Sequence, residues 1–207
     1  MMSTRRLQAA AAAGGAALVL LLTGCTDSSS TEDAGASASH DHGSMSQTAD
    51  PAAAHNDADV SFASGMVPHH EQAIVMSDII LAKQGIDPRV IELANQIKAA
   101  QGPEIATMQK WLTEWGAPVM NHEGHDMSDM GMGMMSDQQL EQLRQAQGVD
   151  ATRQFLTGMI AHHEGAVRMA QTELDTGKAE DAKKLARDII DAQQREIATM
   201  KQILGSL

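Results

Sequence analysis

A segment of fifteen residues occurs twice in this chain of 207 residues, and it restricts the possible folds more than any other feature. Residues 62–76 read FASGMVPHHEQAIVM and residues 155–169 read FLTGMIAHHEGAVRM, with eight of the fifteen positions identical. Each copy is followed by a second related segment, QGPEIATM at residues 101–108 and QQREIATM at residues 193–200, with six of eight positions identical. Each repeat is therefore predicted to form one helical hairpin, and because neither hairpin can bury its apolar face alone, the two should pack together.

The predicted fold is all-α. Aromatic residues make up 2% of the chain, helix-forming residues dominate its last 150 or so positions, and no stretch alternates apolar and polar residues as a strand would. Two hairpins related by a pseudo-twofold axis give a four-helix bundle, with a short extra helix in the connection. The predicted helices are 58–84, 88–115, 150–176 and 179–205, with the short helix at 137–147.

Local signals support these helix ends. Asp87 and Pro88 form an N-cap followed by proline at the first helical position, and Ser136 with Gln139 has the spacing of a capping box. Asp150 is predicted to cap the helix that follows Gly148. Pro68 falls inside the first helix, where it removes a hydrogen bond, so a kink without a break is predicted there.

The N-terminal region has the features of an export signal. A basic start and a short apolar run lead to Leu-Thr-Gly-Cys, which resembles a bacterial lipobox that would leave Cys25 as the lipidated first residue. An ordinary signal peptide with an incidental cysteine is the alternative. The predicted organisation is a lipoprotein signal peptide at 1–24, a disordered tether at 25–56 and a bundle domain at 57–207, which comprises repeat one (57–116), a His/Met-rich loop (117–136) and repeat two (137–207).

This organisation predicts an extracytoplasmic protein that is lipid-anchored to the cell membrane and faces outward. The formal net charge of −12 excludes nucleic acid as a partner, because binding to phosphates needs a basic surface. Such a charge is compatible with cations as ligands, and equally with simple solubility.

The repeats predict a metal site inside the bundle. At helical periodicity the two adjacent histidines of each copy straddle the buried seam, and the second helix of each hairpin carries a carboxylate within its apolar stripe. A buried carboxylate needs a cation, a metal or hydrogen-bond donors. The candidate ligands are His69, His70, Met66, Glu104 and Met108 from one repeat, and His162, His163, Met159, Glu196 and Met200 from the other.

Further residues are expected to support these ligands from behind: Gln101, Gln193, Glu71, Glu164, Met76 and Met169. The alternative is that the methionines fill the core and that each histidine only hydrogen-bonds a neighbouring Glu or Gln as a structural network.

The loop between the repeats predicts a secondary metal site. Residues 121–135 read NHEGHDMSDMGMGMM, a Gly/Asp/Ser context expected to be flexible and exposed. Clustered thioethers with nearby imidazoles match the ligand preference of copper, especially Cu(I), better than that of zinc or magnesium. A scavenger of oxidants or a low-complexity linker is the alternative. The candidate ligands are His122, His125, Met127, Met130, Met132, Met134 and Met135.

The doubled pattern G-M-x-x-H-H-E-x-A-x-x-M, each time followed by Q-x-x-E-I-x-x-M, resembles the bacterial domain-of-unknown-function family 305 over about residues 57–207. The resemblance implies an exported, ferritin-like four-helix bundle, and it implies copper, because some members bind copper in the periplasm and take part in copper resistance. Pro68 in the first copy departs from the pattern.

Three functions follow as hypotheses. The first is a non-enzymatic, membrane-anchored protein that binds, buffers or delivers copper, as Cu(I) or Cu(II), with a metal-handling protein as a possible partner. The second is a di-iron or di-manganese oxidoreductase, although the Glu-x-x-His motif of such bundles is absent from the sequence. The third is a metal-free envelope module that binds another protein. Zinc remains a further candidate ion, and the sequence contains no signal for the oligomeric state.

Overall fold

The structure is a computed structural model, and it describes residues 54–118 and 132–207. The predicted signal peptide, the lipidation of Cys25 and nearly all of the predicted tether therefore lie outside the described residues. Four candidate ligands of the loop lie outside them as well: His122, His125, Met127 and Met130.

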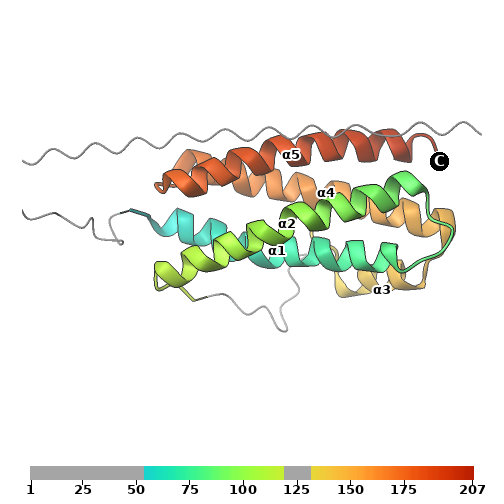
Figure 1. The fold of residues 1–207 in the computed structure, drawn as a ribbon, viewed down its shortest axis with the longest axis horizontal. Helices are drawn as coiled ribbons and strands as arrows, with labels where there is room; N and C mark the ends of the chain where they lie inside the picture. The colour runs from blue at the N-terminus through green and yellow to red at the C-terminus, as the bar shows by residue number, and fades with distance from the viewer. Residues whose placement is uncertain (1–53, 119–131) are drawn as a thin grey trace, which may run out of the picture. The chain divides into compact units, whose positions relative to one another are not determined.

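The described chain is all-α, as predicted (Figure 1). The long helices are α1 (Asp57–Leu81), α2 (Pro88–Glu114), α4 (Gly148–Thr176) and α5 (Glu180–Leu204), and the short helix is α3 (Asp137–Gln145). The number and order of these helices match the sequence prediction, and their ends differ from it by a few residues. Among the described helices, none combines the length and apolarity that a membrane crossing requires.

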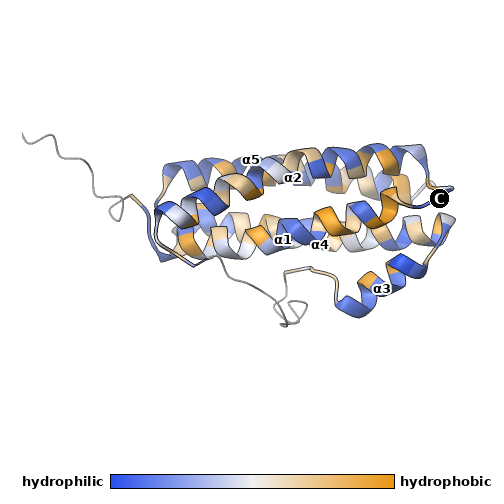
Figure 2. Ribbon diagram, turned by 60° about the horizontal axis from the view of Figure 1, so that its bottom comes forward, coloured by the Kyte–Doolittle hydropathy of each residue, from blue (hydrophilic) through white to orange (hydrophobic). Residues whose placement is uncertain are grey.

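The two repeats form two hairpins that pack into one four-helix bundle. Helices α1 and α2 pack closely, as do α4 and α5, and the hairpins meet mainly through α1 and α4. In Figure 2, α1 and α4 form one layer with α2 and α5 on one side of it, while α3 lies on the opposite side. Helix α3 packs against both α1 and α4. The layer of α1 and α4 is therefore covered by α2 and α5 on one side and, near one end, by α3 on the other.

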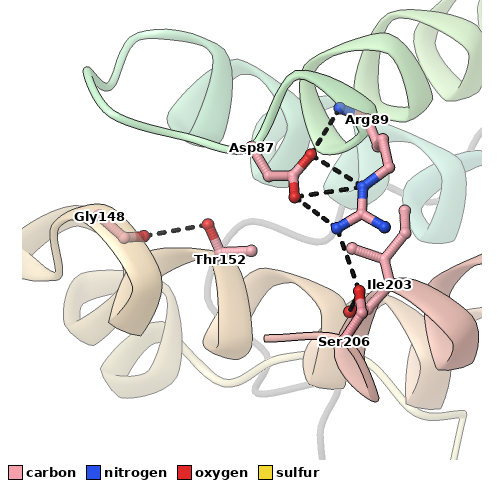
Figure 3. Close-up of polar contacts among 6 residues, drawn as sticks. All are labelled: Asp87, Arg89, Gly148, Thr152, Ile203 and Ser206. Carbon is pink, nitrogen blue, oxygen red and sulfur yellow. Dashed lines mark hydrogen bonds and ion pairs between the residues drawn. The ribbon is translucent and has the colours of Figure 1, made fainter.

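The helix ends follow the predicted caps with one exception. The Asp87 side chain accepts a hydrogen bond from the backbone N–H of Arg89 at 2.9 Å, and the Arg89 guanidinium in turn donates to the Ser206 hydroxyl near the C-terminus (Figure 3). Ser136 and Gln139 form the predicted capping box of α3. The prediction for Asp150 is wrong: α4 begins two residues earlier, at Gly148, and Asp150 lies in its first turn.

Helix α1 continues through Pro68 from Asp57 to Leu81, so the proline does not break it. The kink itself stays a prediction. The start of α1 is secured by a capping box, in which the side chain of Asn56 accepts from the backbone N–H of Asp59 while the Asp59 carboxylate accepts from that of Asn56. Asn56, which was assigned to the predicted tether, thus belongs to the folded domain.

The apolar core consists of two clusters, one toward each end of the bundle. One contains Met76, Ile97, Phe155 and Leu156, together with residues of α3. The other contains Phe62, Leu112 and Ile189. The duplicated histidines belong to neither cluster, although all four are fully buried. Polar side chains are therefore buried between two apolar regions.

Asp59 and Glu173 form a buried carboxyl pair at one end of the bundle. Asp59 accepts hydrogen bonds from the backbone N–H groups of Lys178 and Ala179, which lie just before α5. Burial raises the pKa of Asp59, but hydrogen bonds from Glu173 and from backbone N–H groups outweigh this effect and leave the pKa below its ordinary value. Burial, followed by the hydrogen bond to Asp59, raises the pKa of Glu173 to about 8. The pair therefore retains one proton at neutral pH.

Candidate metal centre

The glycine and the closing methionine of each repeat allow α1 and α4 to approach closely. A Cβ atom on Gly65 would lie 3.1 Å from the terminal methyl of Met169, and one on Gly158 would lie 3.3 Å from that of Met76. Each copy thus supplies a glycine on which the methionine of the other copy packs. Met76 and Met169, expected behind the ligands, join the two helices that carry the histidines.

The first histidine of each copy meets its counterpart at the centre of the bundle. The rings of His69 and His162 lie 3.7 Å apart between centroids, tilted by 37°, and both side chains are fully buried. The second histidines lie farther out, with ring centroids 6.4 Å apart for His69 and His70 and 6.2 Å apart for His162 and His163. The two copies thus converge on one interior, where they form a cluster of four imidazoles, hereafter the histidine cluster.

The outer histidine of each copy is hydrogen-bonded to a glutamate on its own hairpin. His70 Nε2 lies 2.7 Å from Glu104 Oε2, and His163 Nε2 lies 2.6 Å from Glu196 Oε2. The glutamates are partly exposed, with side-chain exposures of 20% and 18%. The seam carboxylates predicted from the sequence therefore each obtain a donor, and they remain in contact with solvent.

These partners determine which nitrogen of each ring carries the proton. A carboxylate only accepts, so His70 and His163 donate from Nε2, and in the neutral ring the lone pair is then on Nδ1. His69 Nε2 lies 2.9 Å from the Met132 carbonyl oxygen, which imposes the same tautomer. The Nδ1 atoms of these three rings and both nitrogens of His162 are buried and have no hydrogen-bond partner in the described part of the chain. Such nitrogens suit a metal ion, and the carboxylate–histidine pairs resemble those found behind metal ligands.

Burial keeps the inner histidines neutral. It lowers the pKa of His69 to about 3, although the hydrogen bond to the Met132 carbonyl acts in the opposite direction. It also lowers the pKa of His162 well below its ordinary value, assisted by the charges of His69 and His163. An imidazole must be neutral to bind a metal, so protons compete weakly for these two rings at neutral pH.

The other candidate ligands within the bundle are four methionines, each one helical turn along its helix from a cluster histidine or from that histidine's glutamate partner. The four methionines are fully buried in the apolar clusters, Met66 and Met108 in one, Met159 and Met200 in the other. The cluster of imidazoles thus has thioether residues in the core on both sides. Packing alone explains such methionines as well as a ligand role does.

Two further pairs were expected to support the ligands. Gln101 and Gln193 are buried with exposures of 2% and 3%, and their side-chain oxygens have no hydrogen-bond partner among the described residues. Glu71 and Glu164 are exposed instead, and Glu164 pairs with Lys201 at 3.1 Å. The glutamines therefore remain candidates for the interior, whereas the two glutamates face solvent.

The end of the His/Met-rich loop is ordered on the bundle, which corrects the prediction that the loop is exposed throughout. Met135 is 8% exposed and belongs to an apolar cluster, while Met132 and Met134 are half-buried. Residues 132–135, hereafter the strap, lie against α4: a Cβ atom on Gly165 would be 1.6 Å from the Met132 carbonyl oxygen. Core packing thus explains Met135, and the strap reaches the histidine cluster through the bond from His69.

The described residues contain no group of three or more His, Cys, Asp or Glu side chains arranged as a metal site. The donor chemistry nevertheless fits an ion: five buried imidazole nitrogens lack a hydrogen-bond partner within the described ranges, and their rings are close neighbours. Leaving buried polar atoms unsatisfied is costly, so a ligand at this position would stabilise the fold.

Known proteins share both the sequence pattern and this fold. The sequence model of the family described as "Domain of unknown function (DUF305)" matches residues 59–204. A solved DUF305 fragment from Deinococcus radiodurans is 33% identical, with a TM-score of 0.68 over 73% of this chain and 98% of that one. A DUF305 protein of Streptomyces coelicolor, described as secreted, is 33% identical with a TM-score of 0.64, over 72% of this chain and 91% of that one.

CopM is also similar, and its solved structures include Cu(I)-bound, Cu(II)-bound and silver-bound forms. Its Cu(II)-bound form is 36% identical over 72% of this chain and 96% of that one, with a TM-score of 0.60. Among curated proteins, one from Acanthamoeba polyphaga mimivirus is 44% identical over 52 residues, which is 25% of this chain and 34% of that protein. This chain thus matches about a third of that protein's length.

Proposed function

The chain belongs to the DUF305 family, and from this premise we propose that it binds copper outside the cytoplasmic membrane, where it buffers the ion or delivers it to another protein. The observation that carries the proposal is the histidine cluster, in which four buried imidazoles from two repeats present unpaired ring nitrogens to one interior. The copper-bound structures of CopM support the choice of metal.

The ligands proposed for copper combine imidazole with thioether. His69, His70, His162 and His163 supply nitrogen, and the four buried methionines supply sulfur, a combination that suits copper and, through sulfur, Cu(I) in particular. Glu104 and Glu196 hold the outer rings in the tautomer that leaves Nδ1 available. The copper ion is cargo in this proposal, and no reaction is assigned to the protein.

The remaining predictions from the sequence complete the proposal. The loop at 117–136 captures additional copper through its histidines and methionines, and its end already lies on the bundle at the strap. The signal peptide and Cys25 place the domain on the outer side of the membrane through a lipid. A Cys25→Ser variant should then be released from the membrane fraction, and retention of that variant in the membrane would contradict the anchor.

The function is tested by competition for Cu(I) with a colorimetric chelator. The wild-type protein should withdraw Cu(I) from the chelator. A variant with all four cluster histidines changed to alanine should lose the tightest binding. Deletion of residues 121–131, which leaves the strap in place, should lower the number of copper ions bound per protein. An unchanged stoichiometry in the deletion variant together with unchanged affinity in the histidine variant would refute the proposal. Elemental analysis of protein from copper-supplemented cells provides the control, because two irons per domain would indicate a di-iron protein instead.

A further inference from the structure

The strap is attached to the bundle by a two-point clamp on α1. The Gln72 side chain donates from Nε2 to the Met135 carbonyl at 2.8 Å and accepts from the Met135 backbone N–H at 2.7 Å. Three residues away along the strap, the Met132 carbonyl accepts the hydrogen bond from His69 at 2.9 Å. Both strap contacts to α1 thus come from residues that lie one helical turn apart on one face of that helix.

The strap also fits closely on α4, and only glycine allows this fit. A Cβ atom on Gly165 would lie 1.6 Å from the Met132 carbonyl oxygen, and one on Gly133 would lie 2.0 Å from the Ala161 carbonyl oxygen. Gly133 also has a φ of +76°, a backbone conformation that glycine adopts without strain. The neighbouring atoms are backbone, so a side chain at either position would displace the strap.

Gln72 and Gly165 occupy the same position in the two copies of the repeat. In an otherwise shared HHE-x-A sequence, this position is glutamine in the first copy and glycine in the second. The difference has a structural reason, because the first copy supplies the clamp and the second supplies the surface on which the strap lies. His69 accordingly obtains a partner on the strap, whereas the equivalent His162 has no hydrogen bond to the strap.

We propose that Gln72 is a positioning residue of the metal centre: by clamping the strap, it holds the Met132 carbonyl on His69 and so keeps the Nδ1 lone pair of His69 available for the ion. This inference rests on the proposed copper-binding function. The Met132 carbonyl does for His69 what Glu104 and Glu196 do for the outer histidines, since each acceptor receives a hydrogen bond from Nε2–H and so keeps the proton on that nitrogen. Partners of this kind affect metal affinity by about 10- to 100-fold.

Two variants release the strap by independent routes. Gln72→Ala removes the clamp, and Gly165→Ala places a methyl group where the Met132 carbonyl lies. Gln72→Glu keeps an acceptor for the Met135 N–H but cannot donate to the Met135 carbonyl, so it should give an intermediate effect. Gly102→Ala is the matched control, because a Cβ atom on that helical glycine meets no atom from any other part of the described fold within 4 Å.

The experiment combines metal-free and metal-loaded measurements on the full chain. In metal-free protein, nitrogen NMR should show His69 as the Nε2–H tautomer and hydrogen exchange should show a protected Met135 amide. Both signatures should be lost in Gln72→Ala and Gly165→Ala, and the affinity for Cu(I) should fall by about 10- to 100-fold in chelator competition. The Gly102→Ala variant should match the wild type in all three measurements.

Three results would overturn the inference. Unchanged Cu(I) affinity in both variants, despite loss of Met135 protection, would show that the strap does not position His69. Retained protection of Met135 in both variants would show that Gln72 and Gly165 do not hold the strap. A wild-type protein that binds no Cu(I) would overturn the proposed function itself, and this failure is recognised separately because the tautomer and amide measurements need no metal.

Discussion

Replacing Glu173 by glutamine should stabilise the protein at alkaline pH. Glu173 is 1% exposed, and its pKa is raised to about 8 from an ordinary value of 4.5, first by burial and then by the hydrogen bond with Asp59. The native state therefore keeps a proton that the unfolded chain releases above pH 4.5. The stability contributed by this proton is fully present below pH 4.5 and is lost as the pH rises to about 8.

The size of the effect follows from this window. Each pH unit costs at most about 1.4 kcal/mol of folding free energy, and screening by water at this end of the bundle reduces the total to about 1–3 kcal/mol. For a domain of this size, that corresponds to a difference of about 2–12 °C in Tm. The glutamine amide donates to Asp59 at every pH, so Glu173→Gln should lack this loss of stability.

The assay is thermal unfolding followed by circular dichroism, between pH 5 and pH 9, with a metal chelator present. The Tm of the wild type should fall relative to that of Glu173→Gln as the pH rises, and the difference should stop growing above about pH 8. Glu141→Gln, at an exposed position of α3, is the control and should follow the wild type. Parallel curves for the wild type and Glu173→Gln would refute the assignment of the shared proton.

Three further changes test other parts of the structure. Glu104→Gln and Glu196→Gln should each lower the affinity for Cu(I) about tenfold or more in chelator competition, because each removes the carboxylate that fixes an outer imidazole. Affinities equal to that of the wild type would contradict this role. Asn56→Ala removes the capping box of α1 and should cost about 1 kcal/mol in urea unfolding, so an unchanged midpoint would count against the cap. Replacing Met66 and Met159 by leucine should change the free energy of unfolding by less than about 1.5 kcal/mol. Isothermal titrations of this variant should show weaker binding of Cu(I) and unchanged binding of Cu(II). Cu(I) binding equal to that of the wild type would assign both methionines to packing alone.

The sequence predicted the fold because its signals were local or repeated. The duplicated segments require two hairpins, and Asp87 with Pro88 and Ser136 with Gln139 mark helix starts through contacts within one turn. The convergence of the histidines was predictable for the same reason, since helical periodicity placed both pairs on the buried seam. The order of the helices could be predicted from the repeats alone, without knowledge of any contact between residues far apart in the sequence.

The strap was not predictable in this way. Its position depends on a clamp from Gln72 and a close approach at Gly165, both of which join residues far apart in the sequence. The sequence does show that the two repeats differ at this position, with Gln72 in one copy and Gly165 in the other. That difference alone does not indicate that a segment of the loop packs there. Glycines and methionines in a polar context instead favoured an exposed loop. In the structure, every residue of the strap is half-buried or buried.

The carboxyl pair of Asp59 and Glu173 was missed as well. Asp59 and Glu173 each lie near the end of a helix, among other polar residues. Nothing in the sequence indicates that the first turn of α1 contacts the end of α4 and the residues just before α5. Such a contact is a product of hairpin packing. It could be found only after the two repeats were placed together.

Copper is proposed to bind between the two repeats, at the histidine cluster. Crystals of the Cu(I)-loaded protein, measured at the copper absorption edge, would locate the ion. An anomalous peak is expected within bonding distance of imidazole nitrogens from both α1 and α4. An anomalous map with no copper at these rings, in a protein that holds copper elsewhere, would contradict the proposal.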